Sequence, residues 1–146
     1  MKTVIATPLD DLKSIQHWLR QRPEQAGPVA FVHIIRRTVY GTDSLDIVQS
    51  PTDEQFRLMR ETFSEHLRRE LLPCMPQSLR GGSTVQILLA NDEAEEMVNY
   101  LKEHRAQTLV VGTRGLKGLA GFFTSSFAQK MLREAPCDLL VLRPLL

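Results

Sequence analysis

The sequence predicts a three-layer α/β/α fold, in which a parallel sheet lies between two layers of helices. Short apolar runs rich in β-branched residues recur along the chain, as in strands that are buried on both faces. Segments with apolar residues at helical spacing separate these runs. This alternation predicts one βαβαβαβαβ domain over residues 1–146, since parallel strands need crossover connections. The expected strands are residues 3–7, 29–35, 84–89, 108–111 and 137–142.

Length and composition exclude several classes of function. A chain of 146 residues can bury a sufficient core without disulfides or a metal. Its formal net charge of +1 gives no electrostatic argument for nucleic acid or an anionic membrane. No apolar stretch is long enough to span a bilayer, and the first apolar run is too short for a signal peptide. Cys74 and Cys137 follow no ligand spacing, so we expect free thiols in a cytoplasmic protein.

The first helix is expected after Pro8, which stops the first strand. Asp10 or Asp11 can cap this helix. Trp18 is more consistent with a core position than with a ligand contact. His33 lies inside an apolar run with no second ligand near it in sequence, so we interpret it as a hydrogen-bonded core histidine rather than a metal ligand. The apolar face of the helix is expected to be Leu12, Ile15, Trp18 and Leu19.

Residues 36–49 form a longer connection, and such connections are often functional or mobile. It could fold over a ligand. We favour a surface loop whose apolar residues cover the core, and leave the roles of Arg36 and Arg37 open. The apolar residues of this loop are Val39, Tyr40 and Ile47.

The next helix is expected to begin at Ser50, with Pro51 in its first turn and Asp53 in the capping-box position, and to end at Pro73. Asn91 is the expected cap of the following helix. Four carboxylates lie near its start, and the helix dipole explains them more simply than a metal site. These carboxylates belong to Asp92, Glu93, Glu95 and Glu96, and the expected buried face comprises Met97, Val98 and Leu101.

The pattern of residues 107–135 predicts a strand, then a glycine-rich loop, then a helix. The glycines fall at every third residue, and a polar group precedes the helix. Glycines allow close backbone approach, and the first amides of a helix have no internal partner, so this stretch can bind phosphate. Arg114 and Lys117 could add positive charge. The stretch could equally be an ordinary crossover, and it is neither a Walker A loop nor a G-x-G-x-x-G fingerprint. The glycines are Gly112, Gly115, Gly118 and Gly121.

A family resemblance rests on two segments. Gly112-Thr-Arg-Gly115, nine residues, and then Ser125-Ser126 resemble the G-x2-G-x9-G-S/T nucleotide motif of the universal stress protein family. The tail from Ala135 to Arg143 resembles the usual end of that family. The resemblance implies a Rossmann-like sheet with strand order 3-2-1-4-5, and ATP or another adenine nucleotide bound where the chain reverses, between the first and fourth strands.

The resemblance also implies which residues contact the nucleotide. The end of the first strand would lie at the adenosine, the second and fourth strands at the adenine, and the loop and last helix at the phosphates. By position, the adenosine residues are Ala6, Thr7 and Pro8, and the adenine residues are Ile34, Val111 and Gly112. The residues toward the phosphates are Thr113, Arg114, Gly115, Ser125, Ser126, Phe127 and Ala128.

Three positions depart from the family pattern. Pro8 stands where ATP-binding members usually have an aspartate that holds the nucleoside, and a lost hydrogen bond to a charged group costs about 1.5–3 kcal/mol. Ala90 replaces a glycine that often follows the third strand. Ser125 replaces the third glycine of the motif: it is unfavourable if the backbone is left-handed there, and favourable if it caps the helix. The phosphate half of the site is therefore retained better than the nucleoside half.

No catalytic constellation is evident, since the histidines lie in separate elements and no serine or cysteine has an evident base. We therefore expect a stress-response or signalling domain that binds an adenine nucleotide. The alternative is an interaction module of the same fold without nucleotide; an enzyme of the wider adenine nucleotide α-hydrolase-like group is a third reading. The family implies homodimers that pair their fifth strands, here Leu139 to Leu142, and the apolar edge agrees. The histidines are His17, His33, His66 and His104.

Overall fold

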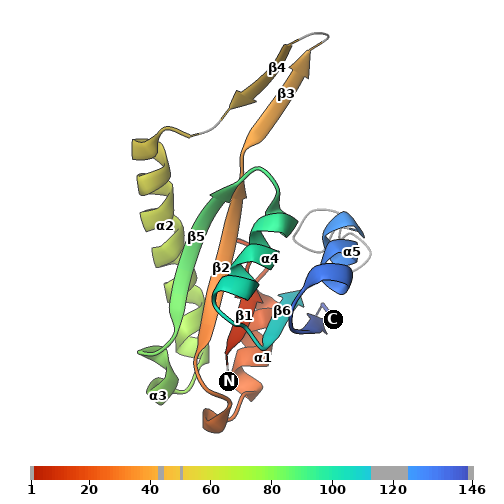
Figure 1. The fold of residues 1–146 in the computed structure, drawn as a ribbon. Helices are drawn as coiled ribbons and strands as arrows, with labels where there is room; N and C mark the ends of the chain where they lie inside the picture. Colours follow the sequence, from red (N-terminus) through yellow and green to blue (C-terminus); the bar gives the residue numbers. More distant parts are fainter. Residues whose placement is uncertain (1, 43–44, 50, 113–124, 145–146) are drawn as a thin grey trace.

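Five parallel strands form the central sheet of the molecule (Figure 1). The computed structural model describes residues 2–42, 45–49, 51–112 and 125–144. The sheet has the order β5-β2-β1-β6-β7, which is the predicted order 3-2-1-4-5 of the five main strands. Successive strands are therefore added on one side of β1 up to β5, and on the other side of β1 from β6 onward, so the strand order reverses between β1 and β6. The strands are β1 (Thr3–Ala6), β2 (Val29–Arg36), β5 (Thr84–Ala90), β6 (Thr108–Gly112) and β7 (Asp138–Leu142).

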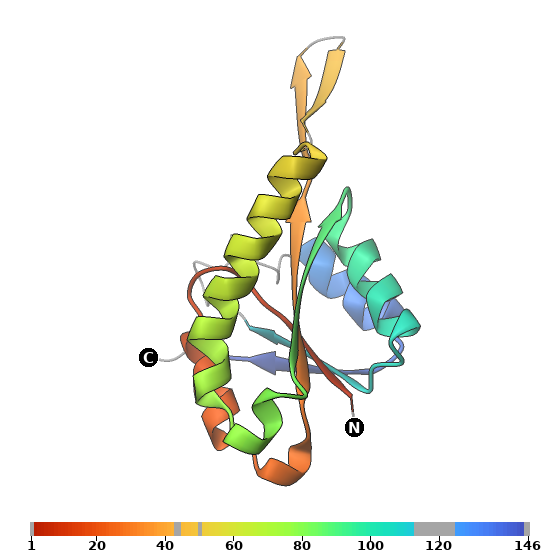
Figure 2. The same ribbon diagram turned by 90° about the vertical axis from the view of Figure 1, so that its left-hand side faces the viewer.

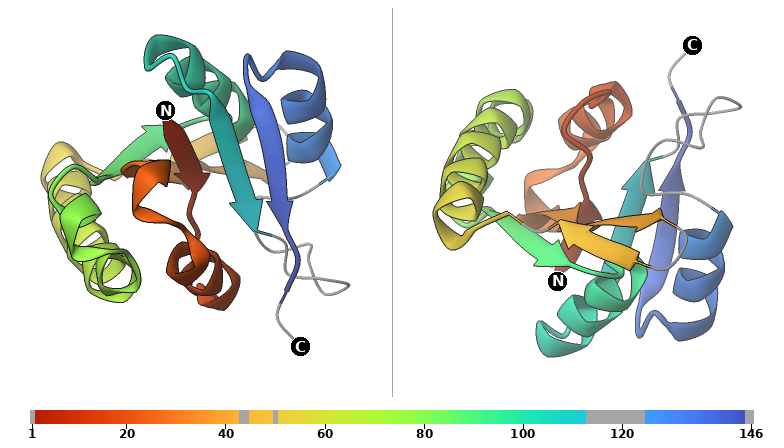
Figure 3. Two further views of the ribbon diagram at one scale, coloured as in Figure 1. Left: turned by 90° about the horizontal axis from the view of Figure 1, so that it is seen from below. Right: turned by 90° about the horizontal axis from the view of Figure 1, so that it is seen from above.

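Helices cover both faces of this sheet. Figure 3 shows α1 and α2 on one side of the strands and α4 and α5 on the other. The three-layer α/β/α architecture is therefore confirmed. The helices are α1 (Lys13–Gln21), α2 (Asp53–Leu71), α4 (Glu93–Glu103) and α5 (Ser125–Glu134), with a short α3 (Gln77–Arg80) before β5. Two 3-10 turns, Glu24–Ala26 and Leu72–Cys74, complete the connections.

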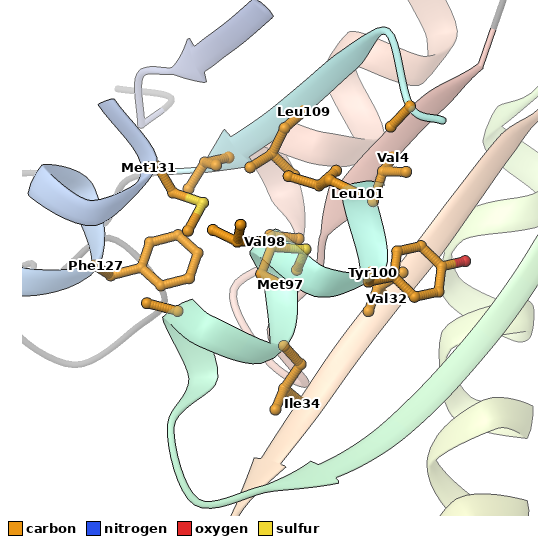
Figure 4. Close-up of a cluster of buried hydrophobic side chains, with 14 of the residues drawn as sticks. Val4, Val32, Ile34, Met97, Val98, Tyr100, Leu101, Leu109, Phe127 and Met131 are labelled. Carbon is orange, nitrogen blue, oxygen red and sulfur yellow. The ribbon is translucent and has the colours of Figure 1, made fainter. Parts of the chain in front are cut away.

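Each face of the sheet has its own apolar core. Successive strand residues point to opposite faces, so Val4 and Ala6 pack toward α4 and α5, whereas Ile5 packs toward α1 and α2. Figure 4 shows the cluster beneath α4 and α5. Its members include Val32, Met97, Leu101, Leu109, Phe127 and Met131. The cluster on the other face includes Ile15, Leu19, Phe31, Leu67, Leu71 and Val110.

The connection between β2 and α2 is a β-hairpin, so the predicted loop is wrong. Strands β3 (Thr38–Thr42) and β4 (Leu45–Gln49) pair antiparallel, with Tyr40 opposite Ile47. Both strands contain residue types that favour strands, such as valine in each, tyrosine in β3 and isoleucine in β4, which favours the hairpin. It projects beyond the end of β2 and away from the sheet (Figures 1 and 2). The contacts expected of Val39, Tyr40 and Ile47 involve side chains outside the described part of the structure.

Two helix starts differ from the predicted caps. Helix α1 has Leu12 at its N-cap with no side-chain cap, so neither Asp10 nor Asp11 serves there. Asp11 instead takes a left-handed backbone conformation with φ of 56°, which aspartate tolerates better than most residues. Helix α2 is capped by Thr52 rather than Ser50. Gln55, three residues later, completes a reciprocal capping box with Thr52.

The cap of α4 is Asp92 rather than the predicted Asn91. The Asp92 carboxylate accepts a hydrogen bond of 3.1 Å from the backbone N–H of Glu95. The Asn91 side chain instead accepts one of 3.2 Å from the Arg37 guanidinium. The predicted buried face of the helix is confirmed for Met97, Val98 and Leu101. Trp18 of α1 is only half-buried, with the Arg22 guanidinium 4.8 Å from its ring centre.

Candidate functional site

The candidate site lies at the carboxyl ends of β1 and β6. Ala6 at the end of β1 pairs with Val32 of β2 on one side and with Val111 of β6 on the other. The segment after β1 leads to α1 on one face of the sheet, whereas α5, after β6, lies on the opposite face. This divergence is the arrangement at which α/β sheets bind ligands.

Thr7 uses all of its polar groups to hold the end of β1. Its side chain is fully buried, and Oγ1 donates a hydrogen bond of 2.9 Å to the Ile5 carbonyl. Its backbone N–H donates to the Val32 carbonyl at 2.9 Å. Its own carbonyl lies 2.7 Å from His33 Nδ1. Thr7 is therefore a structural residue, and Pro8 after it is half-buried.

His33 connects three elements at this end of the sheet. A carbonyl oxygen can only accept, so Nδ1 of His33 carries the proton that bonds to Thr7. Burial lowers the pKa of His33, and the hydrogen bond to Thr7 raises it by less, so the ring is neutral at pH 7. The Phe63 ring of α2 meets it edge to face at 6.1 Å between centroids. The predicted hydrogen bond of His33 is confirmed, although the side chain is half-buried rather than fully in the core. No feature of the sequence indicated Thr7 as the partner.

Two residues that the resemblance assigns to the adenine have buried side chains. Ile34 is 3% exposed and Val111 is fully buried, and both belong to the core beneath α4 and α5. The backbone of Ile34, in contrast, is oriented toward the candidate site. The Val32 carbonyl points toward β1, so by alternation the N–H and carbonyl of Ile34 point to the same side, beyond the last paired residue of β1. Any ligand contact of Ile34 must therefore be made by its backbone.

Gly112 ends β6 against the start of α1. A Cβ built at this position would lie 3.4 Å from Ser14 Oγ and 4.0 Å from Ile15. Both are ordinary van der Waals distances, so packing alone does not demand glycine here. A requirement for glycine at position 112 would therefore come from a ligand or from the loop that follows.

The first turn of α5 holds the remaining predicted contacts. Ser125 is the first residue of the helix and has helical backbone, so the left-handed alternative is excluded there. Phe127 is 4% exposed and packs in the core next to Met131, whereas Ala128 is half-buried (Figure 4). Among its described atoms, this turn offers a ligand its backbone N–H groups. Thr113, Arg114, Gly115 and Lys117, and the side chains of Ser125 and Ser126, lie outside the described residues.

A charged pair lies at the neighbouring ends of β2 and β5. Glu93, in the first turn of α4, is half-buried, and this burial raises the pKa of its carboxyl. Arg36 opposes that shift in pKa, and Asp92 adds to it.

Within the described ranges, no group of three or more histidine, cysteine, aspartate or glutamate side chains could hold a metal. None of the described helices is long and apolar enough to cross a membrane.

Comparison with known proteins decides the family. The family model described as the Universal stress protein family matches residues 6–143. The chain belongs to the universal stress protein family. Universal stress protein YxiE of Bacillus subtilis (strain 168) is 30% identical to it over 122 residues, which is 82% of each chain.

Solved structures of the same family share the fold of this universal stress protein. UspA from Lactobacillus plantarum superimposes with a TM-score of 0.58 at 12% identity, over 98% of this chain and 97% of that one. A universal stress protein solved in complex with cAMP has a TM-score of 0.56 at 14% identity, over 99% and 98%. At these identities the likeness establishes the fold and leaves the ligand open.

Proposed function

We propose that this universal stress protein binds an adenine nucleotide at the carboxyl ends of β1 and β6. The observation that carries the proposal is the reversal of strand order at this point, with the first turn of α5 on one side of it. Helix N-termini bind phosphate, and α/β sheets bind ligands at such reversals. A relative of the same fold was solved with cAMP, which supports an adenine nucleotide as the ligand class.

Main-chain groups would make most of the contacts. The side chains of Thr7, Ile34 and Val111 are buried and engaged in the fold, so none of them can reach a nucleotide without rearrangement. The backbone of Ile34 faces the space beyond β1 and can bond an adenine edge. The phosphates would lie at the N–H groups of α5, with the Ser126 side chain contributed by the first turn of this helix and the Arg114 side chain by the glycine-rich segment.

The nucleoside lacks the family's usual carboxylate. Pro8 provides neither a carboxylate nor an N–H, so we expect binding about ten- to a hundredfold weaker than in a chain with aspartate there. The substitution Pro8→Asp should restore this affinity. Asp10 and Asp11 follow closely, and neither caps α1, so the pair Asp10→Asn and Asp11→Asn tests whether either replaces the missing group.

Freshly purified protein should first be denatured and its released nucleotide identified by mass spectrometry. ATP, AMP and cAMP are then titrated by calorimetry. Arg114→Ala and Ser126→Ala should weaken binding, and Pro8→Asp should strengthen it. Arg133→Ala, which removes an exposed charge in the last turn of α5, is the matched control and should change nothing. No released nucleotide and no heat at millimolar concentrations, for wild type and Pro8→Asp alike, would refute the proposal.

The edge strand β7 supports a second function, assembly into homodimers. Leu140 and Val141 are each 39% exposed, although both are large and apolar. Asp138 donates its backbone N–H to Gln107 beside β6, so by alternation the main-chain groups of Leu139 and Val141 face outward from the edge. An apolar edge with open hydrogen-bonding groups favours pairing with a second copy. We therefore propose pairing through β7, Asp138 to Leu142.

Light scattering during size-exclusion chromatography tests this assembly. Wild type should be a dimer at micromolar concentration, and Leu140→Lys should shift it toward monomer. Leu58→Lys in α2 is the matched control, because Leu58 is 50% exposed and lies away from β7. A monomeric wild type would refute the proposal. A dimer that binds no nucleotide would favour a pure interaction module, and conversion of ATP to ADP or AMP by the pure protein would indicate an enzyme.

A further inference from the structure

We propose a second binding site, for a small organic molecule with an apolar body and a carboxylate, in the pocket between α4 and the amino ends of β1, β2 and β5. The pocket has a volume of about 470 Å³. Lys2 comes directly before β1 and Pro28 directly before β2. All five strands run parallel, so this pocket lies at the opposite end of the sheet from the candidate nucleotide site.

The pocket arises because the first half of β5 is open on the α4 face. Thr84 and Gln86 share that face with Ala90, since alternate residues of a strand point the same way. Ala90 is 6% exposed, whereas Thr84 and Gln86 are exposed and line the pocket. The last turn of α4 forms the opposing wall. The volume is within the range of pockets that bind small molecules.

Tyr100 provides the observation that points to a ligand. The residue is only 5% exposed, and its ring packs with the core beneath α4. Figure 4 shows its hydroxyl oxygen pointing away from the other labelled side chains. Within the described part of the chain this hydroxyl makes no hydrogen bond, although Tyr100 lines the pocket. Buried hydroxyl groups nearly always have a partner, so an unpaired one beside a pocket indicates a bound group.

His104 holds the Tyr100 ring in place. The two rings stack at 3.9 Å between centroids with 22° between their planes. His104 Nδ1 lies 3.0 Å from the Tyr100 carbonyl and must be the donor, because the carbonyl can only accept. Burial, together with the charge of Glu103, raises the pKa of Tyr100. Its hydroxyl therefore stays protonated at neutral pH and can donate to an acceptor in the pocket.

The lining selects an anion with an apolar body. Among the described residues that line the pocket, Lys2 alone carries a formal charge at neutral pH, and that charge is positive. The Gln86 amide and the Tyr100 hydroxyl add neutral donors, and a carboxylate can accept from all three groups. Pro28 and Ala30 present apolar surface to the rest of the ligand. A carboxylate on an aromatic or aliphatic body matches this combination.

Benzoate is the test probe, with benzyl alcohol as its uncharged match. Each is titrated into the full, uniformly ¹⁵N-labelled chain while amide shifts are followed by NMR. We expect benzoate to shift the amides of Gln86, Tyr100 and His104 in the millimolar range. We expect benzyl alcohol to bind at least tenfold more weakly. Absence of these shifts, equal binding of the alcohol, or shifts confined to the carboxyl ends of the strands would overturn the proposal.

Two substitutions test the donors. Tyr100→Phe keeps the ring and removes the hydroxyl, so benzoate should bind about tenfold more weakly or worse. Lys2→Gln should weaken it as well. Tyr40→Phe removes the other tyrosine hydroxyl of the sequence and should change nothing. The melting temperature of ligand-free Tyr100→Phe should equal or exceed that of wild type. A lower melting temperature with unchanged benzoate binding would show that the hydroxyl already has a partner, and the proposal would fail.

Discussion

The two ends of the central sheet are built on different principles. At the carboxyl end, Thr7 has a partner for its hydroxyl, its N–H and its carbonyl, and His33 anchors it to β2. At the amino end, Tyr100 as a residue is nearly as buried, and its hydroxyl has no hydrogen-bond partner in the described part of the chain. At the carboxyl end, the described polar side chains are therefore bonded within the fold, and mainly backbone groups remain for a ligand. At the amino end, a side-chain hydroxyl remains to donate a hydrogen bond to a ligand.

This difference separates two kinds of evidence for a site. The proposed nucleotide site is inferred from topology and from the spacing of glycines, because a backbone that contacts a ligand closely favours residues without a Cβ. The amino-end pocket is inferred from a hydroxyl that has no hydrogen-bond partner among the described residues. Such a pocket has no sequence motif, since Lys2, Gln86 and Tyr100 come from distant segments of the chain.

The largest effect on stability is expected at Phe127, which the family resemblance assigns to the phosphates but which the structure places in the core. Phe127 is 4% exposed, so Phe127→Ala should lower the free energy of unfolding by about 3–5 kcal/mol. Leu132→Ala in the same helix is the control, because Leu132 is 73% exposed and should change stability by less than about 0.5 kcal/mol. Urea denaturation followed by circular dichroism measures both. Equal effects of the two substitutions would contradict the assignment of Phe127 to the core.

A smaller effect compares the two ends directly by removing one hydroxyl at each. Thr7→Val deletes the donor to the Ile5 carbonyl at a fully buried position and should cost about 1–2 kcal/mol. Tyr100→Phe deletes a hydroxyl that has no hydrogen-bond partner among the described residues, so it should cost nothing or stabilise the ligand-free protein slightly. Both variants keep the shape of the side chain, so the unfolding free energies report the hydrogen bonds. A reversed order would remove the distinction between the two ends.

The smallest effect is a pH dependence at the carboxyl end. His33 has a pKa lowered by burial, so below its ordinary value near 6.5 the unfolded chain binds more protons than the native one. The contribution of His33 to stability should therefore fall as pH drops from about 7 through 6.5 toward the lower native pKa. His33→Asn keeps a donor for the Thr7 carbonyl and removes the titration.

The melting temperature of His33→Asn should consequently fall less between pH 7 and pH 5 than that of wild type. His17→Asn is the control, because His17 is exposed and should leave the wild-type pH profile unchanged. Thermal unfolding monitored across this pH range gives the comparison. Parallel profiles for wild type and His33→Asn would show that the ring titrates alike in both states.

The residue pattern by itself predicted the layers, whereas the sheet order and the location of the candidate site were implied by the family resemblance. Strands buried on both faces require continuous apolar runs, and amphipathic helices require apolar spacing, so both features are legible locally. The glycine spacing from Gly112 and the resemblance of the tail placed the site at the end of β6. The predicted helix starts were less accurate. The N-cap of α2 is Thr52 rather than the predicted Ser50, and that of α4 is Asp92 rather than Asn91, because capping depends on which side chain reaches a free N–H.

Only the tertiary structure decided what each polar group does. Residues 38–42 and 45–49 form a hairpin because their strand-forming residues can pair with each other, an outcome that a local pattern leaves open. His33 forms a hydrogen bond with Thr7, which lies 26 residues away along the chain, and no pattern near either residue predicts this pairing. Tyr100 occupies an apolar position of the helix pattern and carries a polar hydroxyl. That this hydroxyl lacks a partner within the described ranges is apparent only once the sheet, α4 and the start of the chain come together. Periodicity is a local property, whereas hydrogen-bond satisfaction depends on groups that folding brings together.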